Sequence, residues 1–120
     1  MSVSDEIMKA IGAHGSWKLK LKTAVTTGKS DVNVSALSQD NQCEFGKWLY
    51  SLQGNMRQSA EWKSVQKLHA DFHKEAGLVL DLALKGQKAE AEKRIANGGA
   101  FDKVSKEIAV SLAQWKNKCE

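Results

Sequence analysis

Residues 57–84 read RQSAEWKSVQKLHADFHKEAGLVLDLAL, and this stretch decides the fold. Apolar residues recur in it every three to four positions, which is the spacing of one face of an α-helix. The stretch contains no proline, and Gly86, of a residue type that commonly ends helices, follows it. We therefore predict one helix over residues 57–84. The face that should point inward holds apolar residues and two histidines: Val65, Leu68, His69, Phe72, His73, Ala76, Val79, Leu80 and Ala83.

The N-terminal segment predicts a second long helix, from Ser4 to Thr27. Ser4 is of a residue type that caps helix starts, and Gly28 supplies the stop. The apolar face of this helix contains His14. Lys18 falls on the same face and is its weak point, so we expect its aliphatic stem to lie along the core while the amine reaches solvent.

Two more helices are expected in the rest of the chain. Residues 28–41 form a polar connection that is longer than most loops, and a turn of helix is expected within it. A short helix from Cys43 to Leu52 would place Cys43 in its first turn, where the helix dipole and free backbone N–H groups favour a thiolate. The last helix should run from Lys88 to Lys116, bent or locally opened at Gly98-Gly99.

The predicted fold is therefore all-α, a domain resembling a four-helix bundle, with three long helices and one short helix that carries Cys43. No stretch alternates with the period of a β-strand. A length of 120 residues predicts a single domain over residues 1–120, and 42% hydrophobic and 27% charged residues are ordinary values for a soluble globular protein.

Composition also excludes several classes of function. The N-terminus lacks the basic and apolar blocks of a secretory signal, and no apolar run is long enough to span a bilayer, so we expect a cytoplasmic protein without membrane insertion. The net charge is +4, but the lysines are scattered, and Lys18, Lys20 and Lys22 spread around a helix. We therefore expect no nucleic-acid partner. Cys119, next to the chain end, is expected to be a bystander.

The chain's three histidines and Cys43 are its main candidates for chemistry. His69 and His73 are four residues apart, so one helix face presents both rings to a single ion. Alone, each histidine is more often a hydrogen-bonded core residue. Three buried imidazoles, however, would each need a partner, and one shared cation would satisfy His14, His69 and His73 together. With Cys43 they make the four ligands that zinc prefers. A full ligand set favours a structural or sensory metal over a catalytic one.

Two metalloenzyme classes do not fit this pattern. Zinc proteases of the HExxH type need a glutamate directly after the first histidine, and this chain has Ala70 there. Di-iron bundles need Glu-x-x-His on two helices, and no glutamate stands three residues before a histidine. We therefore expect no enzymatic activity. A purely structural bundle that binds no metal stays open at this point.

Three motifs in order, HGSW at 14–17, CEFGKW at 43–48 and HADFH at 69–73, resemble the bacterial chemoreceptor zinc-binding (CZB) domain. The resemblance implies a helical bundle, often a homodimer, that binds Zn²⁺ through His14, Cys43, His69 and His73. It also implies residues that surround these ligands, with the two tryptophans shielding the site from water: Trp17, Phe45, Gly46 and Trp48. Trp62 and Trp115 lie outside the motifs and are expected either in the core or at a dimer seam.

The function implied by the resemblance is sensory. Domains of this family act as inputs to chemoreceptors and diguanylate cyclases, so chemotaxis or cyclic-di-GMP signalling proteins are the implied partners. The input would be zinc itself or an oxidant such as hypochlorous acid, with Cys43 as the redox switch. A zinc buffering or delivery protein without a signalling output stays open, and we expect residues 1–120 to leave no room for a signalling domain, which favours this alternative.

Overall fold

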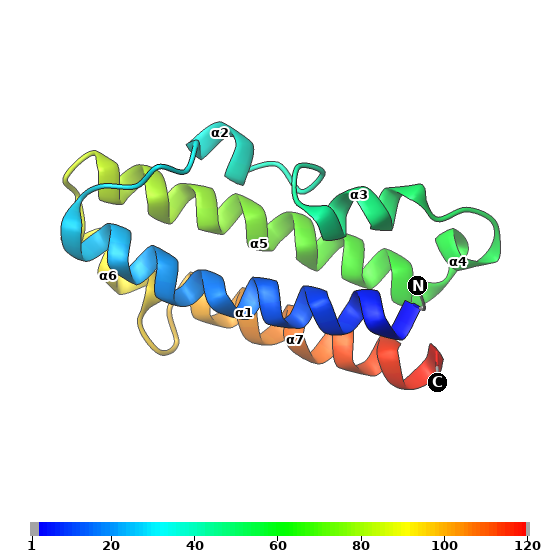
Figure 1. Ribbon diagram of the computed structural model, residues 1–120. Coiled ribbons are helices and arrows are strands. Elements are labelled where there is room, and N and C mark those ends of the chain that lie inside the picture. The colour runs from blue at the N-terminus through cyan, green and yellow to red at the C-terminus, as the bar shows by residue number, and fades with distance from the viewer. Residues whose placement is uncertain (1–2, 120) are drawn as a thin grey trace.

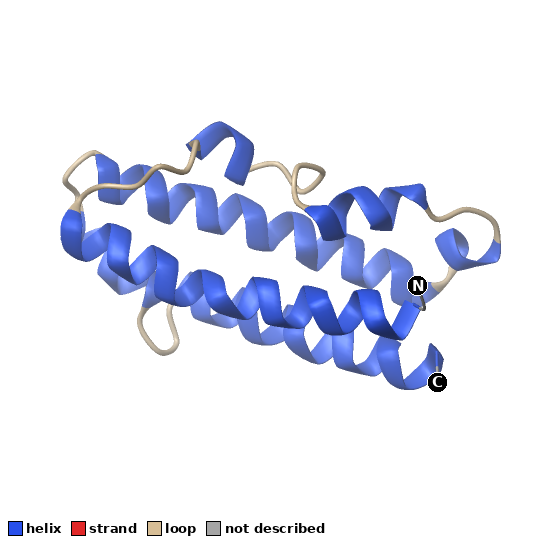
Figure 2. Cartoon of the chain, in the orientation of Figure 1, coloured by secondary structure: helices blue, strands red, loops and turns tan. Residues whose placement is uncertain are grey.

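The computed structural model describes residues 3–119, and its regular structure is helical, without a strand in that range (Figure 2). Three long helices and four short ones follow one another: α1 (Val3–Thr27), α2 (Val34–Leu37), α3 (Glu44–Ser51), α4 (Asn55–Gln58), α5 (Ala60–Leu84), α6 (Lys88–Ile95) and α7 (Ala100–Cys119). The prediction of an all-α fold is confirmed. Within the described range, every helix is too short or too polar to cross a bilayer.

Helices α1, α5 and α7 pack side by side along the length of the molecule (Figure 1). Helix α6, which precedes α7 in the chain, packs against all three of them. Residues 34–58, which we call the strap, hold α2, α3 and α4 and run along one edge of α5. Since α3 contacts both α1 and α5, the strap fills the place that a fourth long helix would take in a bundle.

Apolar burial between the three long helices stabilises this arrangement. Phe72 of α5 and Phe101 of α7 are fully buried, with ring centroids 5.3 Å apart. The predicted inward face of residues 57–84 is buried throughout except at Leu68, which is half-buried. Trp62 and Trp115 are also core residues: the indole N–H of Trp62 donates to the Leu49 carbonyl (3.0 Å), and Trp115 is 2% exposed.

Two predicted helix starts are wrong. Helix α5 does not begin at Arg57, because Ser59 has extended backbone dihedrals and its Oγ accepts the N–H of Trp62 (3.1 Å), which makes Ser59 the cap. Ser4 is not a cap, because α1 is already helical at Val3. The turn of helix expected in the 28–41 connection is present as α2, and Gly28 ends α1 with a φ of 72°.

The predicted helix over 88–116 is divided into α6 and α7 by residues 96–99, which include the Gly98-Gly99 pair where an interruption was expected. The buried carboxylate of Asp102 explains the break. It accepts the backbone N–H of Gly98 (2.9 Å) and the amine of Lys106 (2.8 Å). Its other oxygen lies 3.4 Å from the amine of Lys18, so the lysine that seemed misplaced on α1 pairs with a carboxylate of α7. The side chain of Cys119 lies outside what the structure describes.

Two helical glycines should respond in opposite ways to alanine. At Gly77 of α5 an added Cβ would lie 1.9 Å from Ser38 Oγ and 3.0 Å from Ser38 Cβ, so α2 would have to move. At Gly12 of α1 an added Cβ meets nothing within 4 Å. We expect Gly77→Ala to lower the free energy of unfolding by about 1–3 kcal/mol and Gly12→Ala to raise it by about 0.5–1 kcal/mol. Urea unfolding of both variants tests this, and equal effects would contradict the close approach of α2.

Candidate metal centre

The four predicted ligand residues meet at one point beneath the strap. His14 comes from α1, His69 and His73 from α5, and Cys43 directly precedes α3. One nitrogen of each ring and the Cys43 sulfur all lie within 4.8 Å of one another. The histidines are buried (5%, 0% and 2% exposed for His14, His69 and His73), and Cys43 is half-buried. The fold thus brings together residues that are up to 59 positions apart in sequence.

The distances suit a tetrahedral ion. His69 Nε2 lies 3.0 Å from His14 Nε2, 3.1 Å from His73 Nε2 and 3.3 Å from Cys43 Sγ. Ligands bound to zinc at about 2.0–2.3 Å in a tetrahedron are themselves about 3.3–3.8 Å apart. The three distances from His69 lie at or just below this range and the remaining pairs lie within 4.8 Å, so modest movements of these side chains would let the cluster accept such an ion.

Backbone carbonyls fix the orientation of two of the rings. The Nδ1–H of His14 donates to the Ala10 carbonyl (2.7 Å), and the Nδ1–H of His73 donates to the Leu37 carbonyl (2.9 Å). Since a carbonyl can only accept, both rings carry their proton on Nδ1, and both Nε2 lone pairs face His69. One proton on His69 Nε2 could satisfy only one of them. A shared cation satisfies both, which makes these nitrogens a fitting set of zinc donors.

The third ring is held by packing. His69 Nδ1 is buried and has no hydrogen-bond partner among the described residues. Phe45 of α3 packs edge-on against this ring, with centroids 5.1 Å apart. Buried polar atoms are normally paired, and an orphaned atom marks a functional position. A bound cation on Nε2 would leave Nδ1 as the one uncompensated atom of the site.

Cys43 occupies the N-cap of α3, one position before the first helical turn in which we expected it. Its sulfur accepts the backbone N–H of Gly46 (3.3 Å). Burial nevertheless raises the pKa of the Cys43 thiol, outweighing the backbone N–H groups that lower it. The backbone N–H groups at the helix start favour the thiolate as expected, but burial outweighs them. A cation at the cluster would reverse the balance, because a bound metal deprotonates a coordinating thiol.

The predicted surrounding residues take different roles. Position 46 requires glycine for steric reasons, since a Cβ there would lie 1.8 Å from the Asp40 carbonyl oxygen. The backbone N–H of Gly46 also donates to the Cys43 sulfur. Phe45 is buried and packs against His14 and His69. Trp48 lies further out and contacts Phe45 and Trp115, with centroids 5.6 and 5.9 Å away. Trp48 thus supports Phe45 and has no ring contact with the histidines.

Sequence reasoning missed a polar network that anchors the strap. The hydroxyl of Tyr50 on α3 donates to the carboxylate of Asp40 (2.5 Å), and the side-chain amide of Gln66 on α5 donates to the Tyr50 oxygen (3.0 Å). These bonds link the loop before Cys43 to α5. No spacing rule relates Asp40 to Tyr50 before the loop is folded; the one signal was that Tyr50 is the chain's single tyrosine.

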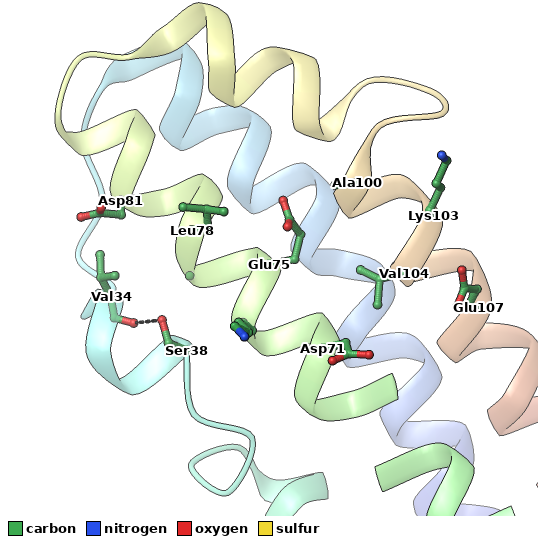
Figure 3. Close-up of a pocket in the computed structure, with 12 residues that line it drawn as sticks. Val34, Ser38, Asp71, Glu75, Leu78, Asp81, Ala100, Lys103, Val104 and Glu107 are labelled. Atoms are coloured by element: carbon green, nitrogen blue, oxygen red, sulfur yellow. Dashed lines mark hydrogen bonds between the residues drawn. The ribbon is translucent and has the colours of Figure 1, made fainter. Parts of the chain in front are cut away.

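A pocket of about 220 Å³ opens beside the cluster, between α1 and α3. Its lining includes two of the four cluster residues: Glu6, Lys9, Ala10, Ala13, His14, Trp17, Cys43, Glu44 and Phe45. A larger hollow of about 700 Å³ lies between α2, α5 and α7, and Figure 3 shows the residues that line it. Among them, the Ser38 hydroxyl donates a hydrogen bond to the Val34 carbonyl. None of the four cluster residues lines that hollow, so the metal chemistry belongs to the smaller pocket.

Burial keeps the three imidazoles neutral. It lowers the pKa of His14 to about 4, although the bond to Ala10 opposes the shift. It lowers the pKa of His69 and of His73 in the same direction. Neutral imidazole is the form that binds metal, so the fold holds the rings ready for an ion at neutral pH.

The metal-free protein should lose stability on acidification. Between pH 6.5 and about 4, His14 is protonated in the unfolded chain but stays neutral in the folded protein. The free energy of unfolding therefore falls as pH falls. From pH 7 to pH 5 we expect a loss of about 2 kcal/mol from His14 alone, or roughly 5–10 °C in melting temperature. Thermal melts with chelator at both pH values measure this.

A His14→Leu variant is the control, because it should reduce the dependence on pH by the share of His14, while His69 and His73 keep theirs. The stabilising effect of the Asp102 carboxylate is retained at pH 5, since its hydrogen bonds hold its pKa at about 2. An equal melting temperature at pH 7 and pH 5 in the wild-type protein would contradict neutral, buried rings.

A family model described as the chemoreceptor zinc-binding domain matches residues 14–80. The matched stretch begins at His14 and takes in Cys43, His69 and His73, so all four cluster residues lie inside it. Searches of curated proteins and of solved structures gave no match. Because the matched stretch covers more than half of the 120 residues and its motif residues meet in one cluster fit for a metal ion, this chain belongs to the chemoreceptor zinc-binding domain family, a sensory and regulatory family.

Proposed function

We propose that the chain is one zinc-binding domain in which His14, Cys43, His69 and His73 hold a structural and regulatory Zn²⁺. The observation that carries the proposal is the convergence of three Nε2 atoms and one sulfur, with two of the rings fixed so that their lone pairs face inward. A bound cation would be a common partner for all four donor atoms. Four protein ligands leave no open position for a substrate, which argues against catalysis.

Cys43 is the proposed redox switch. It is the half-buried member of the set, and it lines the pocket between α1 and α3. A two-electron oxidant such as hypochlorous acid would transfer its oxygen to the thiolate and leave as chloride, and the resulting sulfenate is a poorer ligand. The histidines resist this chemistry. Loss of the Cys43 donor would free the start of α3 from α5, so that movement of the strap reports oxidation.

We further propose that this movement is read by a chemotaxis or cyclic-di-GMP signalling protein, in the cytoplasm, with the domain acting as a homodimer. The family supports these assignments. Zinc buffering or delivery is the second candidate, and the pocket that reaches two ligand residues favours it, because a buffer must exchange its ion. A buffer would exchange zinc without a change at the strap on oxidation.

The metal content of the purified protein tests whether the chain binds zinc. We expect about one zinc per chain in the isolated protein, and removal by a chelator should lower the free energy of unfolding by about 4 kcal/mol if zinc is about a thousandfold above its Kd, or roughly 10–20 °C in melting temperature. Cys43→Ala should lose most of this effect. Cys119→Ala makes the same change at the other cysteine and should keep it. Metal-free wild-type protein with unaltered melting would refute the proposal.

Oxidation tests the switch separately. Stoichiometric hypochlorous acid should release zinc from the wild-type protein and from Cys119→Ala, measured with a coloured zinc chelator. Hydrogen exchange of the α3 backbone should rise at the same time, because the strap loses one anchor. Release without faster exchange in α3 would favour the buffering role over signalling.

A further inference from the structure

The metal cluster borders a pocket on the side of His14 and Cys43. His69 and His73 are 0% and 2% exposed and line neither the small pocket nor the larger hollow. His14 and Cys43 form part of the wall of the pocket between α1 and α3. An ion that reaches the cluster without unfolding the chain would therefore meet these two residues first.

The opposite sides of the cluster are closed by packing. The Leu37 carbonyl of α2 takes the Nδ1–H of His73, and the loop at Asp40 lies against Gly46 with no space for even a methyl group. Phe72 is fully buried and packs edge-on against His14, with centroids 5.0 Å apart. Passage on these sides would require the strap to detach.

Charge at the pocket favours a cation. The chain carries a net charge of +4, which opposes the approach of a divalent ion. The pocket, however, is lined by two carboxylates, Glu6 of α1 and Glu44 of α3, against one amine. That amine, of Lys9, lies 3.9 Å from a Glu6 oxygen and is 61% exposed, so solvent screens it. Counted over the lining residues, the balance is negative on a positive protein; the amine of Lys20 lies over the Trp17 ring but does not line the pocket.

The size of the opening is set by small and aromatic residues. Ala13 is exposed and lines the pocket with a single methyl group, while Trp17 is half-buried beside it. The amine of Lys20 lies 4.7 Å above the Trp17 ring, which holds this indole at the surface. A larger side chain at Ala13 would therefore narrow the pocket without touching a donor atom.

We propose that this pocket is the route by which zinc enters and leaves the site, that Glu6 and Glu44 attract the incoming ion, and that Ala13 and Trp17 set the width of the opening. The inference rests on the proposed function, because it requires the cluster to bind zinc. Binding would begin at His14 and Cys43, the thiol of Cys43 losing its proton to solvent, and the ion would reach His69 and His73 last.

The first experiment narrows the pocket with Ala13→Trp. Stopped-flow mixing with Zn²⁺ gives the association rate, and transfer to a coloured chelator gives the dissociation rate. We expect both rates to fall at least fivefold by the same factor, so that Kd is unchanged, which is the signature of a blocked path. Ala109→Trp adds the same side chain at another exposed helical alanine, outside this pocket, and should leave both rates as in wild type.

The second experiment removes the charges, and it stands if Ala13→Trp fails to fold. The double variant Glu6→Gln/Glu44→Gln should lower the association rate threefold to tenfold at low ionic strength, and high salt should abolish the difference. Glu92→Gln/Glu107→Gln changes the net charge equally at exposed positions outside the pocket and should have no such effect.

Wild-type exchange rates in folded Ala13→Trp, or equal slowing by the two charge variants, would overturn the route while zinc binding itself stands. Failure of the wild-type protein to bind zinc would instead refute the proposed function. The two failures are therefore distinguishable.

Discussion

The structure depends on one constraint: three imidazoles and a thiol are buried around a single point. Desolvation disfavours charge on each of them, lowering the pKa of the histidines and raising that of Cys43. Neutral donors packed against one another leave lone pairs without partners. The rest of the fold is arranged so that one divalent ion would resolve this conflict, which is why stability, pH response and metal binding are coupled.

The strap connects the metal cluster to the packing of the long helices. Between α1 and α5 the described residues form no fourth long helix, and residues 34–58 take its place. The strap is attached through small contacts: Gly46 against the Asp40 loop, Gly77 against Ser38, and the Asp40–Tyr50–Gln66 network. An ion bound at Cys43 would add the strongest link. The strap also buries Leu37, Phe45 and Leu49 in the core, so a bound ion would add a ligand bond to an element that is already anchored by apolar packing.

The same geometry separates the four donors by access. His69 and His73 lie on α5, the most enclosed helix, and serve as the fixed half of the site. His14 and Cys43 border a small, locally acidic pocket and form the half that an ion or an oxidant meets. In both proposed functions, oxidation at sulfur and exchange of metal would use one opening, which ties the regulatory and the buffering hypotheses to the same few residues.

The helical class, the inward face of α5 and the four residues that meet could be predicted from the sequence, because helical periodicity is a local property and His69 and His73 share a face by spacing. Features that depend on distant partners became visible in the folded chain. Lys18 of α1 pairs with Asp102 of α7, the orientation of His73 requires the Leu37 carbonyl, and the pKa of Cys43 depends on its burial. Burial and hydrogen bonding across the chain are set by packing, and no window of sequence contains both partners.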